Sequence, residues 1–284
     1  MNAKGFIVSS VAAVILSGLS VLAQADQFKL AIMQDEKGAA QKYAPLADYL
    51  KTKGVEVTLV GTPDYVKAAQ MFAAGEVDGM FSGSGVAGTM LIKDLAIPVV
   101  RPVSKEGTST YWAVVIAPTG AAKFTGSADY FAGKKVMFTS LASSGEMYFH
   151  SLPGANAVKA TIMKAASHGA AIDALSKGVA DVAIVKNRVW DKEKSKYSNL
   201  TMAGEDNGEN PDNTLIVSKK ANAETVKKVS STLLGLKSDS SAGANAVRDS
   251  LNIKEYITTT NADFKHNLEM LKKAGVDASF NFAF

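Results

Sequence analysis

The sequence contains no cysteine, and it has only three histidines and two tryptophans among 284 residues. Without cysteine the chain forms no disulfide and offers no thiolate ligand to a metal ion. It also lacks the Gly-x-Ser-x-Gly elbow, the Walker loop and the His-Glu-x-x-His motif. The acidic pair Asp35 and Glu36 lies in a polar loop and does not support a glycosidase mechanism. We therefore expect neither an enzyme nor a protein with a cofactor or metal site.

A long hydrophobic run is missing as well. The apolar segment Val11–Leu22 is interrupted by serine and glycine, and no later stretch approaches the about 18 uninterrupted apolar residues that indicate a membrane span. Lys4 precedes this segment and Ala23-Gln24-Ala25 follows it, which predicts a secretory signal peptide over residues 1–25, cleaved after about Ala25. No cysteine is available for a lipid anchor. We expect an exported periplasmic protein without a membrane anchor.

Charge of neither sign dominates. Lysine and arginine number 31 and aspartate and glutamate 27, a formal net charge of +4, and the sequence pI is about 9.0. The positive charges are spread along the chain and do not form the basic stripe that is typical of a nucleic-acid-binding protein. Hydrophobic residues make up 47% of the chain, enough for a large core, and the length suits two lobes better than one.

Strands and helices alternate along the chain. Phe28–Met33 has the apolar alternation of a strand, and Thr62 followed by Pro63 is typical of a helix start, with Thr62 as its cap. This alternation predicts an α/β fold with parallel βαβ units. The other predicted elements are a helix at 43–51, strands at 55–60 and 77–81, a strand at 136–138, a strand at 214–217, and helices at 223–236 and 262–274.

An internal similarity indicates two halves. Phe72–Phe81 and Leu175–Ile184 both read apolar-x-x-Gly-x-x-Asp followed by a strand. Two related α/β halves would produce this similarity, and so would convergence on a common helix-glycine-strand connection. Both interpretations stay open at this stage.

Two extended segments, Tyr111–Ile116 and Gly204–Pro211, are candidates for crossings between two lobes. They predict a first lobe formed by residues 26–115 and 213–284, and a second lobe formed by residues 116–212. The two crossing strands would then act as a hinge.

The segment after the strand at 136–138 is the main candidate site. Ser143-Ser144-Gly145 lies between this strand and a helix that starts near Glu146. Unpaired N–H groups, the positive end of the helix dipole and two hydroxyls can hold an anion there. An ordinary serine N-cap is the alternative. The Glu146 carboxylate would repel an anion, so we leave it out of the site.

Several motifs, taken together and in order, resemble the phosphonate, phosphate and phosphite branch of periplasmic substrate-binding proteins, which serve ABC transporters. The resemblance implies two α/β lobes of the type II class, each a mixed, mostly parallel sheet flanked by helices, that close on a small anionic ligand. It also implies a permease partner in the inner membrane and a monomer. The motifs are Tyr43–Leu50, Asp64-Tyr65, Gly75–Asp78, Ser143-Ser144-Gly145, His168–Leu175 and Gly178–Asp181.

In that family the phosphoryl group is held by the serine-rich helix start, by tyrosines and by a histidine. We call the anion-binding segment Ser143-Ser144-Gly145 the cradle. Relatives carry a further hydroxyl where this chain has Ala142, so the cradle has one hydroxyl fewer here. Without the resemblance, the tyrosines could be boundary residues and the histidine a surface cap. Ser82 and Ser84 form a second possible set of donors. The matching positions here are Ser143, Ser144, Gly145, Tyr65, Tyr111 and His168.

Relatives that prefer aminoalkyl phosphonates hold the ligand ammonium with two acidic residues. The matching positions here are Arg188 or its neighbour Asn187, and Asn213, none of which carries a negative charge. This predicts a ligand without an amine. A shift of register by a few residues would instead bring Asp212 or Asp191 to the site and supply the missing charge.

Two other functions stay open. A periplasmic module could bind the same kind of solute and report it to a membrane receptor kinase instead of delivering it to a permease. An enzyme acting on a phosphorylated substrate has less support, because no catalytic motif accompanies the cradle.

Overall fold

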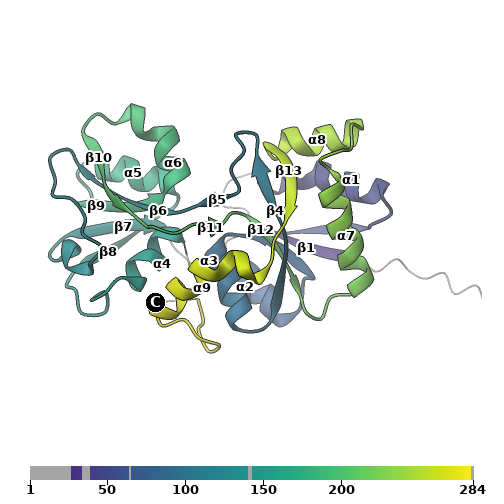
Figure 1. The fold of residues 1–284 in the computed structure, drawn as a ribbon, viewed down its shortest axis with the longest axis horizontal. Coiled ribbons are helices and arrows are strands. Elements are labelled where there is room, and N and C mark those ends of the chain that lie inside the picture. Colours follow the sequence, from purple (N-terminus) through teal and green to yellow (C-terminus); the bar gives the residue numbers. More distant parts are fainter. Residues whose placement is uncertain (1–26, 34–38, 64, 140–142, 283–284) are drawn as a thin grey trace, which may run out of the picture.

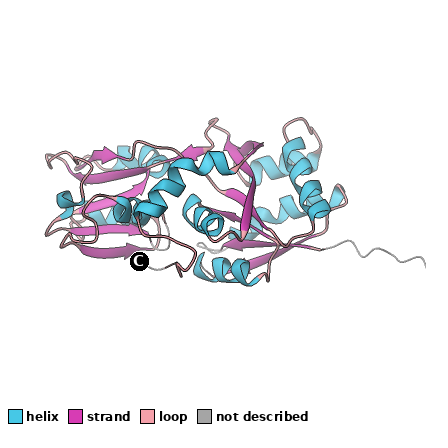
Figure 2. Cartoon of the chain, turned by 60° about the horizontal axis from the view of Figure 1, so that its bottom comes forward, coloured by secondary structure: helices cyan, strands magenta, loops and turns pink. Residues whose placement is uncertain are grey.

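The structure is a computed structural model that describes residues 27–33, 39–63, 65–139 and 143–282. The predicted signal peptide, the acidic pair Asp35 and Glu36, and Ala142 lie outside the described residues. The described chain is an elongated molecule of two lobes, each built on its own β-sheet with helices on both faces (Figure 1). The same layers are visible after a 60° rotation (Figure 2). The predicted two-lobed α/β fold is therefore confirmed.

The first lobe contains a six-stranded sheet in the order β13-β4-β12-β3-β1-β2. Strand β1 runs parallel to β2 and β3, whereas β12 and β13 run antiparallel to their neighbours. The apolar alternation of β1 places Leu30 in the core on one face and Ala31 in the core on the other. The strands are β1 (Phe28–Met33), β2 (Val57–Thr62), β3 (Gly79–Ser82), β4 (Ala96–Ser104), β12 (Thr214–Ser218) and β13 (Ile253–Thr258).

Helices cover both faces of this sheet. On one face α1 (Ala44–Thr52), α7 (Ala223–Gly235) and α8 (Ala242–Ser250) pack on β2, β4 and β13, and on the other lie α2 (Tyr65–Ala74) and α3 (Ser84–Ile92). Helix α2 begins at Tyr65, so the prediction that Thr62 caps it is wrong. Thr62 ends β2 instead, and its buried hydroxyl donates to the Ile32 carbonyl at 3.4 Å.

The second lobe contains a five-stranded sheet in the order β10-β6-β9-β7-β8, in which β7 runs parallel to β8 and β9. Ile172 of α5 and Trp190 of α6 pack on one face, and Met147 of α4 packs on the other. The elements are β6 (Ala113–Pro118), β7 (Lys135–Thr139), β8 (Thr161–Ala165), β9 (Val182–Lys186), β10 (Leu200–Glu205), α4 (Ser144–Ser151), α5 (His168–Ser176) and α6 (Asn187–Glu193).

The internal similarity corresponds to equivalent places in the two sheets. In each half a helix, α2 or α5, leads into a strand, β3 or β9, that pairs in parallel with an earlier strand of the same sheet, β1 or β7. The Asp78 carboxylate accepts the N–H of Lys29 at 2.8 Å, and the Asp181 carboxylate accepts the N–H of Lys135 at 2.7 Å. In both lobes the repeated aspartate thus bonds to the backbone near the start of the neighbouring parallel strand. This shared contact favours the interpretation of two related α/β halves over convergence on a common connection.

Two strands cross between the lobes. Strand β5 (Thr110–Tyr111) pairs antiparallel with β11 (Asn210–Pro211), and these short strands connect the two large sheets. Helix α9 (Lys265–Lys273) packs against α3 of the first lobe and α4 of the second. Its His266 contacts the Asp206 carboxylate at 2.9 Å, and this hydrogen bond raises the pKa of His266. The chain thus touches itself across the lobes at the crossings and along α9. The described part of the chain also contains short 3-10 helices at Ala39–Tyr43, Ala128–Phe131, Lys194–Lys196 and Asn261–Phe264.

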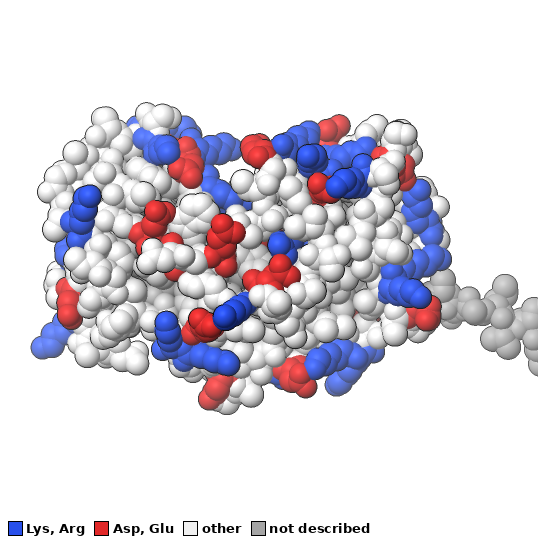
Figure 3. All heavy atoms as spheres, in the orientation of Figure 1, with Lys and Arg blue, Asp and Glu red and all other residues white. Residues whose placement is uncertain are grey.

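Acidic and basic side chains are interspersed on the face seen in Figure 3, without a continuous basic stripe. Among the helices of the described ranges, none combines the length and the apolar character that a membrane crossing requires.

Candidate functional site

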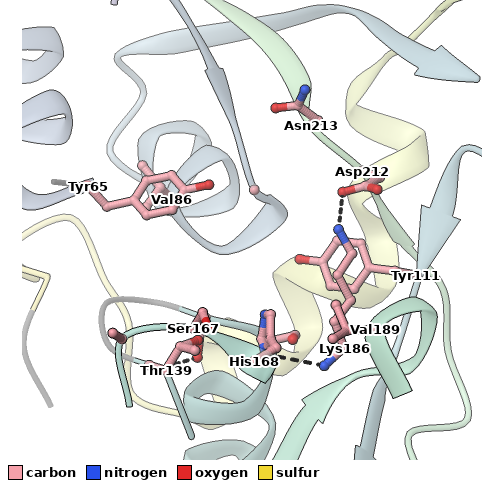
Figure 4. Close-up of a pocket in the computed structure, with 14 residues that line it drawn as sticks. Tyr65, Val86, Tyr111, Thr139, Ser167, His168, Lys186, Val189, Asp212 and Asn213 are labelled. Carbon is pink, nitrogen blue, oxygen red and sulfur yellow. Dashed lines mark hydrogen bonds and ion pairs between the residues drawn. The ribbon is translucent and has the colours of Figure 1, made fainter. Parts of the chain in front are cut away.

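A cavity of about 460 Å³ is lined by residues of both lobes and of the crossing segments (Figure 4). It contains both polar and apolar side chains, as expected of a ligand site. Its lining residues are Tyr65, Gly83, Val86, Tyr111, Thr139, Ser143, Ser144, Ala166, Ser167, His168, Lys186, Val189, Asp212 and Asn213.

Three helices from two lobes begin at this cavity. Gly83 precedes α3, Ser143 precedes α4 and Ser167 precedes α5, and all three residues line the cavity. The first N–H groups of a helix lack intrahelical acceptors and carry a partial positive charge. Their convergence from both lobes makes the cavity favourable for an anion.

The adjacent serines at the start of α4 differ in their contacts. Ser143 is the N-cap: its hydroxyl donates to the Thr139 carbonyl at 2.6 Å and accepts the N–H of Glu146 at 3.2 Å. Ser144 is only 7% exposed, yet its hydroxyl has no hydrogen-bond partner among the described residues. A buried hydroxyl without a hydrogen-bond partner is energetically costly. Such a hydroxyl in the lining of a cavity therefore indicates a position where a ligand binds. The cap interpretation thus applies to Ser143, and Ser144 keeps a hydroxyl for binding.

Two further residues of α4 support the cradle from behind. Gly145 lies where a Cβ atom would be 2.2 Å from the Ile184 carbonyl oxygen, so only glycine lets α4 approach β9 this closely. The buried Glu146 carboxylate forms an ion pair with Lys164. This pairing offsets the repulsion that the carboxylate would exert on an anion bound at the helix start. Gly145 and Glu146 do not line the cavity themselves.

His168 is the first residue of α5 and lines the cavity. Burial lowers its pKa to about 4, and the positive charge of Lys186 contributes to the shift. The ring is therefore neutral at pH 7. Its Nδ1 accepts the backbone N–H of Lys186 at 3.4 Å, which places the ring proton on Nε2. His168 thus has one N–H donor for a ligand and no full charge.

The two tyrosines reach the site from the first lobe and the first crossing, whereas the second serine pair does not line the cavity. Tyr65 and Tyr111 line the cavity, and the Tyr111 hydroxyl forms a hydrogen bond with the buried Ser84 hydroxyl. Burial raises the pKa of Tyr111, so its hydroxyl stays protonated. Ser84 thus contributes through Tyr111. Ser82 is fully buried, donates to the Gly83 carbonyl at 2.9 Å and does not line the cavity.

The far end of the cavity differs from what the sequence predicted. Asp212 lines it beside Asn213, so the cavity wall carries a carboxylate that the expected positions Asn187, Arg188 and Asn213 did not include. Arg188 does not line the cavity and forms an ion pair with Asp212 from behind. Asn187 is buried, and its side chain accepts the N–H of Trp112 at 3.1 Å. Both residues belong to α6, which begins at Asn187, and their side chains are engaged with Trp112 and Asp212.

Asn213 does line the cavity, with its side-chain amide donating to the Tyr43 hydroxyl at 3.3 Å. Sequence reasoning missed Lys186, Thr139 and Ser167, all of which line the cavity. A signal was available, because Thr139 and Lys186 are the last residues of the parallel strands β7 and β9. In open α/β sheets ligands bind at the carboxyl ends of the strands.

Two α/β lobes joined by two crossing strands, with a cavity between them, define a type II periplasmic binding protein. Residues 28–264 match the family model of the ABC transporter phosphonate periplasmic substrate-binding protein, and the chain belongs to this family. Members of this family are substrate-binding proteins of transporters and not enzymes. A comparison with curated proteins finds no match.

Solved structures show the same fold. XAC2383 from Xanthomonas citri, bound to a chloride ion, has a TM-score of 0.71 at 15% identity and covers 88% of this chain and 97% of its own. PA3383 from Pseudomonas aeruginosa is a binding protein component of an ABC phosphonate transporter. It has a TM-score of 0.66 at 16% identity, and the match covers 87% of this chain and 86% of PA3383. PhnD1 from Prochlorococcus marinus, in complex with methylphosphonate, has a TM-score of 0.67 at 17% identity, and the match covers 88% of this chain and 98% of PhnD1.

No group of three or more histidine, aspartate or glutamate side chains suited to a metal ion occurs within the described ranges. The charged residues that line the cavity are Lys186 and Asp212, and its other polar groups include hydroxyls, the His168 ring and the Asn213 amide.

Proposed function

We propose that this protein captures a small tetrahedral oxyanion, of the phosphonate, phosphite or phosphate type, between its lobes and delivers it to an ABC permease. The observation that carries the proposal is the buried Ser144 hydroxyl, which has no hydrogen-bond partner among the described residues and lies at a cavity where three helix N-termini converge. The hydroxyl and the helix N-termini supply hydrogen-bond donors to an anion without the desolvation cost of burying several full positive charges. Family membership supports the same class of ligand.

In this proposal the cradle consists of the Ser144 hydroxyl and the N–H groups of Ser144 and Gly145, with Ser143 holding the turn. His168 donates through Nε2 from the second lobe, and Tyr65 and Tyr111 donate from the other side of the cavity. Contacts to both lobes favour the closed arrangement of the chain, because a ligand stabilises the state in which it makes more contacts. Ser84 orients Tyr111, while Ser82, Asn187, Arg188 and Asn213 support the cavity wall.

We propose that residues 1–25 are removed after about Ala25 and that the mature protein acts as a monomer in the periplasm. We also propose that the lobes, 26–115 with 213–284 and 116–212, meet at the paired strands β5 and β11, where bending would close the cavity.

Isothermal titration calorimetry of the mature protein tests this function. We expect binding of one molecule per chain for at least one of phosphate, phosphite and methylphosphonate. Sulfate serves as the comparison anion, since it is tetrahedral but carries no proton to donate. The absence of heat and of thermal stabilisation with all four anions would overturn the proposal.

A further inference from the structure

Lys186 places a positive charge at the end of the cavity away from the Ser144 cradle. It is the last residue of β9, and its side chain runs along the Tyr111 ring toward Asp212 (Figure 4). The ammonium lies 2.5 Å from an Asp212 carboxylate oxygen and 4.3 Å from the centre of the Tyr111 ring. The Lys186 side chain is 22% exposed and that of Asp212 is 13% exposed, so water screens this contact only in part.

A carboxylate beside an aromatic face is a favourable place for an ammonium group. The carboxylate accepts charge-assisted hydrogen bonds, and the face of the ring attracts a cation. In this chain the place is taken by Lys186, and Arg188 forms a second ion pair with the same Asp212 carboxylate. The acid therefore already has two cationic partners, and the three side chains together carry a net charge of +1.

We propose that Lys186 is a specificity-determining residue: its ammonium occupies the subsite that a ligand amine would need, and it restricts the ligand to oxyanions without an amine. This inference rests on the proposed function and names the ligand class within it. A ligand ammonium at this end would displace Lys186 from Asp212 or lie beside it. Two like charges about 4 Å apart in a partly screened site cost enough to lower affinity about tenfold or more.

The selectivity that the sequence predicted thus has a different origin. Asp212 does provide a negative charge at this end, but Lys186 and Arg188 compensate it. A purely structural role for Lys186, as an ion pair between β9 and the second crossing, makes a different prediction. In that case, removing the Lys186 ammonium would change the affinity for all ligands by a similar factor, because it would affect only the closed arrangement of the lobes.

The test compares methylphosphonate with 2-aminoethylphosphonate by calorimetry at fixed ionic strength. The parent protein should bind methylphosphonate about tenfold or more tightly than the amine-bearing ligand. Lys186→Met keeps the aliphatic stem but removes the ammonium, and it should shift the ratio of the two affinities about tenfold or more toward 2-aminoethylphosphonate. Lys186→Gln is the second variant, in case the methionine lowers expression.

Two controls separate this effect from general electrostatics. Lys192→Met removes the same charge from an exposed position on α6 and should leave the ratio unchanged. Adding Asp212→Asn to Lys186→Met should abolish the gained affinity for the amine, since the vacated subsite then lacks its carboxylate.

The inference is overturned if the parent binds both phosphonates equally, or if both Lys186 variants keep the parental ratio while still binding methylphosphonate. Failure of the proposed function is distinguishable: in that case the parent binds no oxyanion at all.

Discussion

The hydroxyls of Ser143 and Ser144 are one residue apart in sequence but have different environments. Ser143 both donates and accepts within the turn, whereas Ser144 is buried without a partner among the described residues. The two serines therefore provide a matched pair of substitutions at the same helix start. One should affect stability and the other affinity.

We expect Ser144→Ala to weaken oxyanion binding about 10- to 150-fold, because a hydrogen bond to a charged group contributes roughly 1.5–3 kcal/mol. Its effect on the free energy of unfolding should be small. Ser143→Ala should lower the free energy of unfolding by about 0.5–2 kcal/mol through loss of the cap. Calorimetry and urea unfolding measure both quantities. If Ser144→Ala binds as tightly as the parent, this hydroxyl takes no part in binding.

Burial of His168 gives a prediction about pH. Its pKa is lowered to about 4 from 6.5, so the unfolded chain binds more protons than the folded chain between these values. The stability contributed by the neutral ring is fully present above pH 6.5 and is lost as the pH falls toward 4. We expect His168→Gln to remove this part of the pH dependence, which amounts to about 2.5 kcal/mol at pH 4.5.

The measurement is urea unfolding of parent and variant at pH 7 and pH 4.5. His150, whose pKa burial also lowers to about 4, and His266, whose pKa is raised, remain in both proteins. The difference between the two proteins therefore reports His168. An identical loss of stability in both would show that His168 is not the group responsible.

At the scale of elements, the position of α4 depends on the absence of a side chain at Gly145. The missing Cβ atom lets the helix start lie directly against β9 and β7, where an added Cβ would be 2.2 Å from the Ile184 carbonyl oxygen and 2.9 Å from Phe138 Cβ. The backbone oxygen cannot move aside without disturbing the sheet. The whole N-terminus of α4 would have to shift, together with the Ser144 cradle.

We expect Gly145→Ala to lower the free energy of unfolding by about 1–3 kcal/mol and to weaken oxyanion binding as well. Gly235, in the last turn of α7, is the control because a Cβ atom added there would have no neighbour within 4 Å. Gly235→Ala should be neutral or stabilise by about 0.5–1 kcal/mol through helix propensity. Chemical unfolding and calorimetry compare the two, and equal behaviour would contradict the close approach at Gly145.

At the scale of the whole molecule, the lobes contact each other in two ways. The paired strands β5 and β11 connect the sheets, and α9 packs on α3 and α4 from different lobes. A ligand held by donors from both lobes adds a third connection through the cavity. Its binding should therefore make the molecule both more stable and more compact.

We expect an oxyanion at about one hundred times its Kd to raise the free energy of unfolding by about 2.7 kcal/mol. Small-angle X-ray scattering should show a smaller radius of gyration under the same conditions. Ser144→Ala at the same ligand concentration is the control, and it should show a much smaller change in both. Stabilisation without compaction would mean that the ligand binds one lobe only.

The sequence by itself determined the elements and their class, because hydrophobic periodicity, caps and glycine stops act over a few residues. The strand at Phe28–Met33 was predicted with its observed bounds, and most of the other predicted elements lie within about two residues of the observed ones. Strands β4, β8, β10 and β13 and helix α8 were not predicted. The repeated Gly-x-x-Asp was visible as well, and so was the serine-rich helix start at Ser143 and Ser144. These features depend on neighbours in the chain, and they were sufficient for the two-lobed fold and the family.

Only the tertiary structure decided which side chains meet. Lys186 contacts Asp212, 26 residues later, and Tyr111 contacts Ser84, 27 residues earlier. Arg188 lies outside the cavity that Lys186 lines, although the two are separated by a single residue. The physical reason is that a strand or a helix turns each successive side chain in a different direction, and the direction that faces the cavity is set by sheet pairing and by the packing of the lobes.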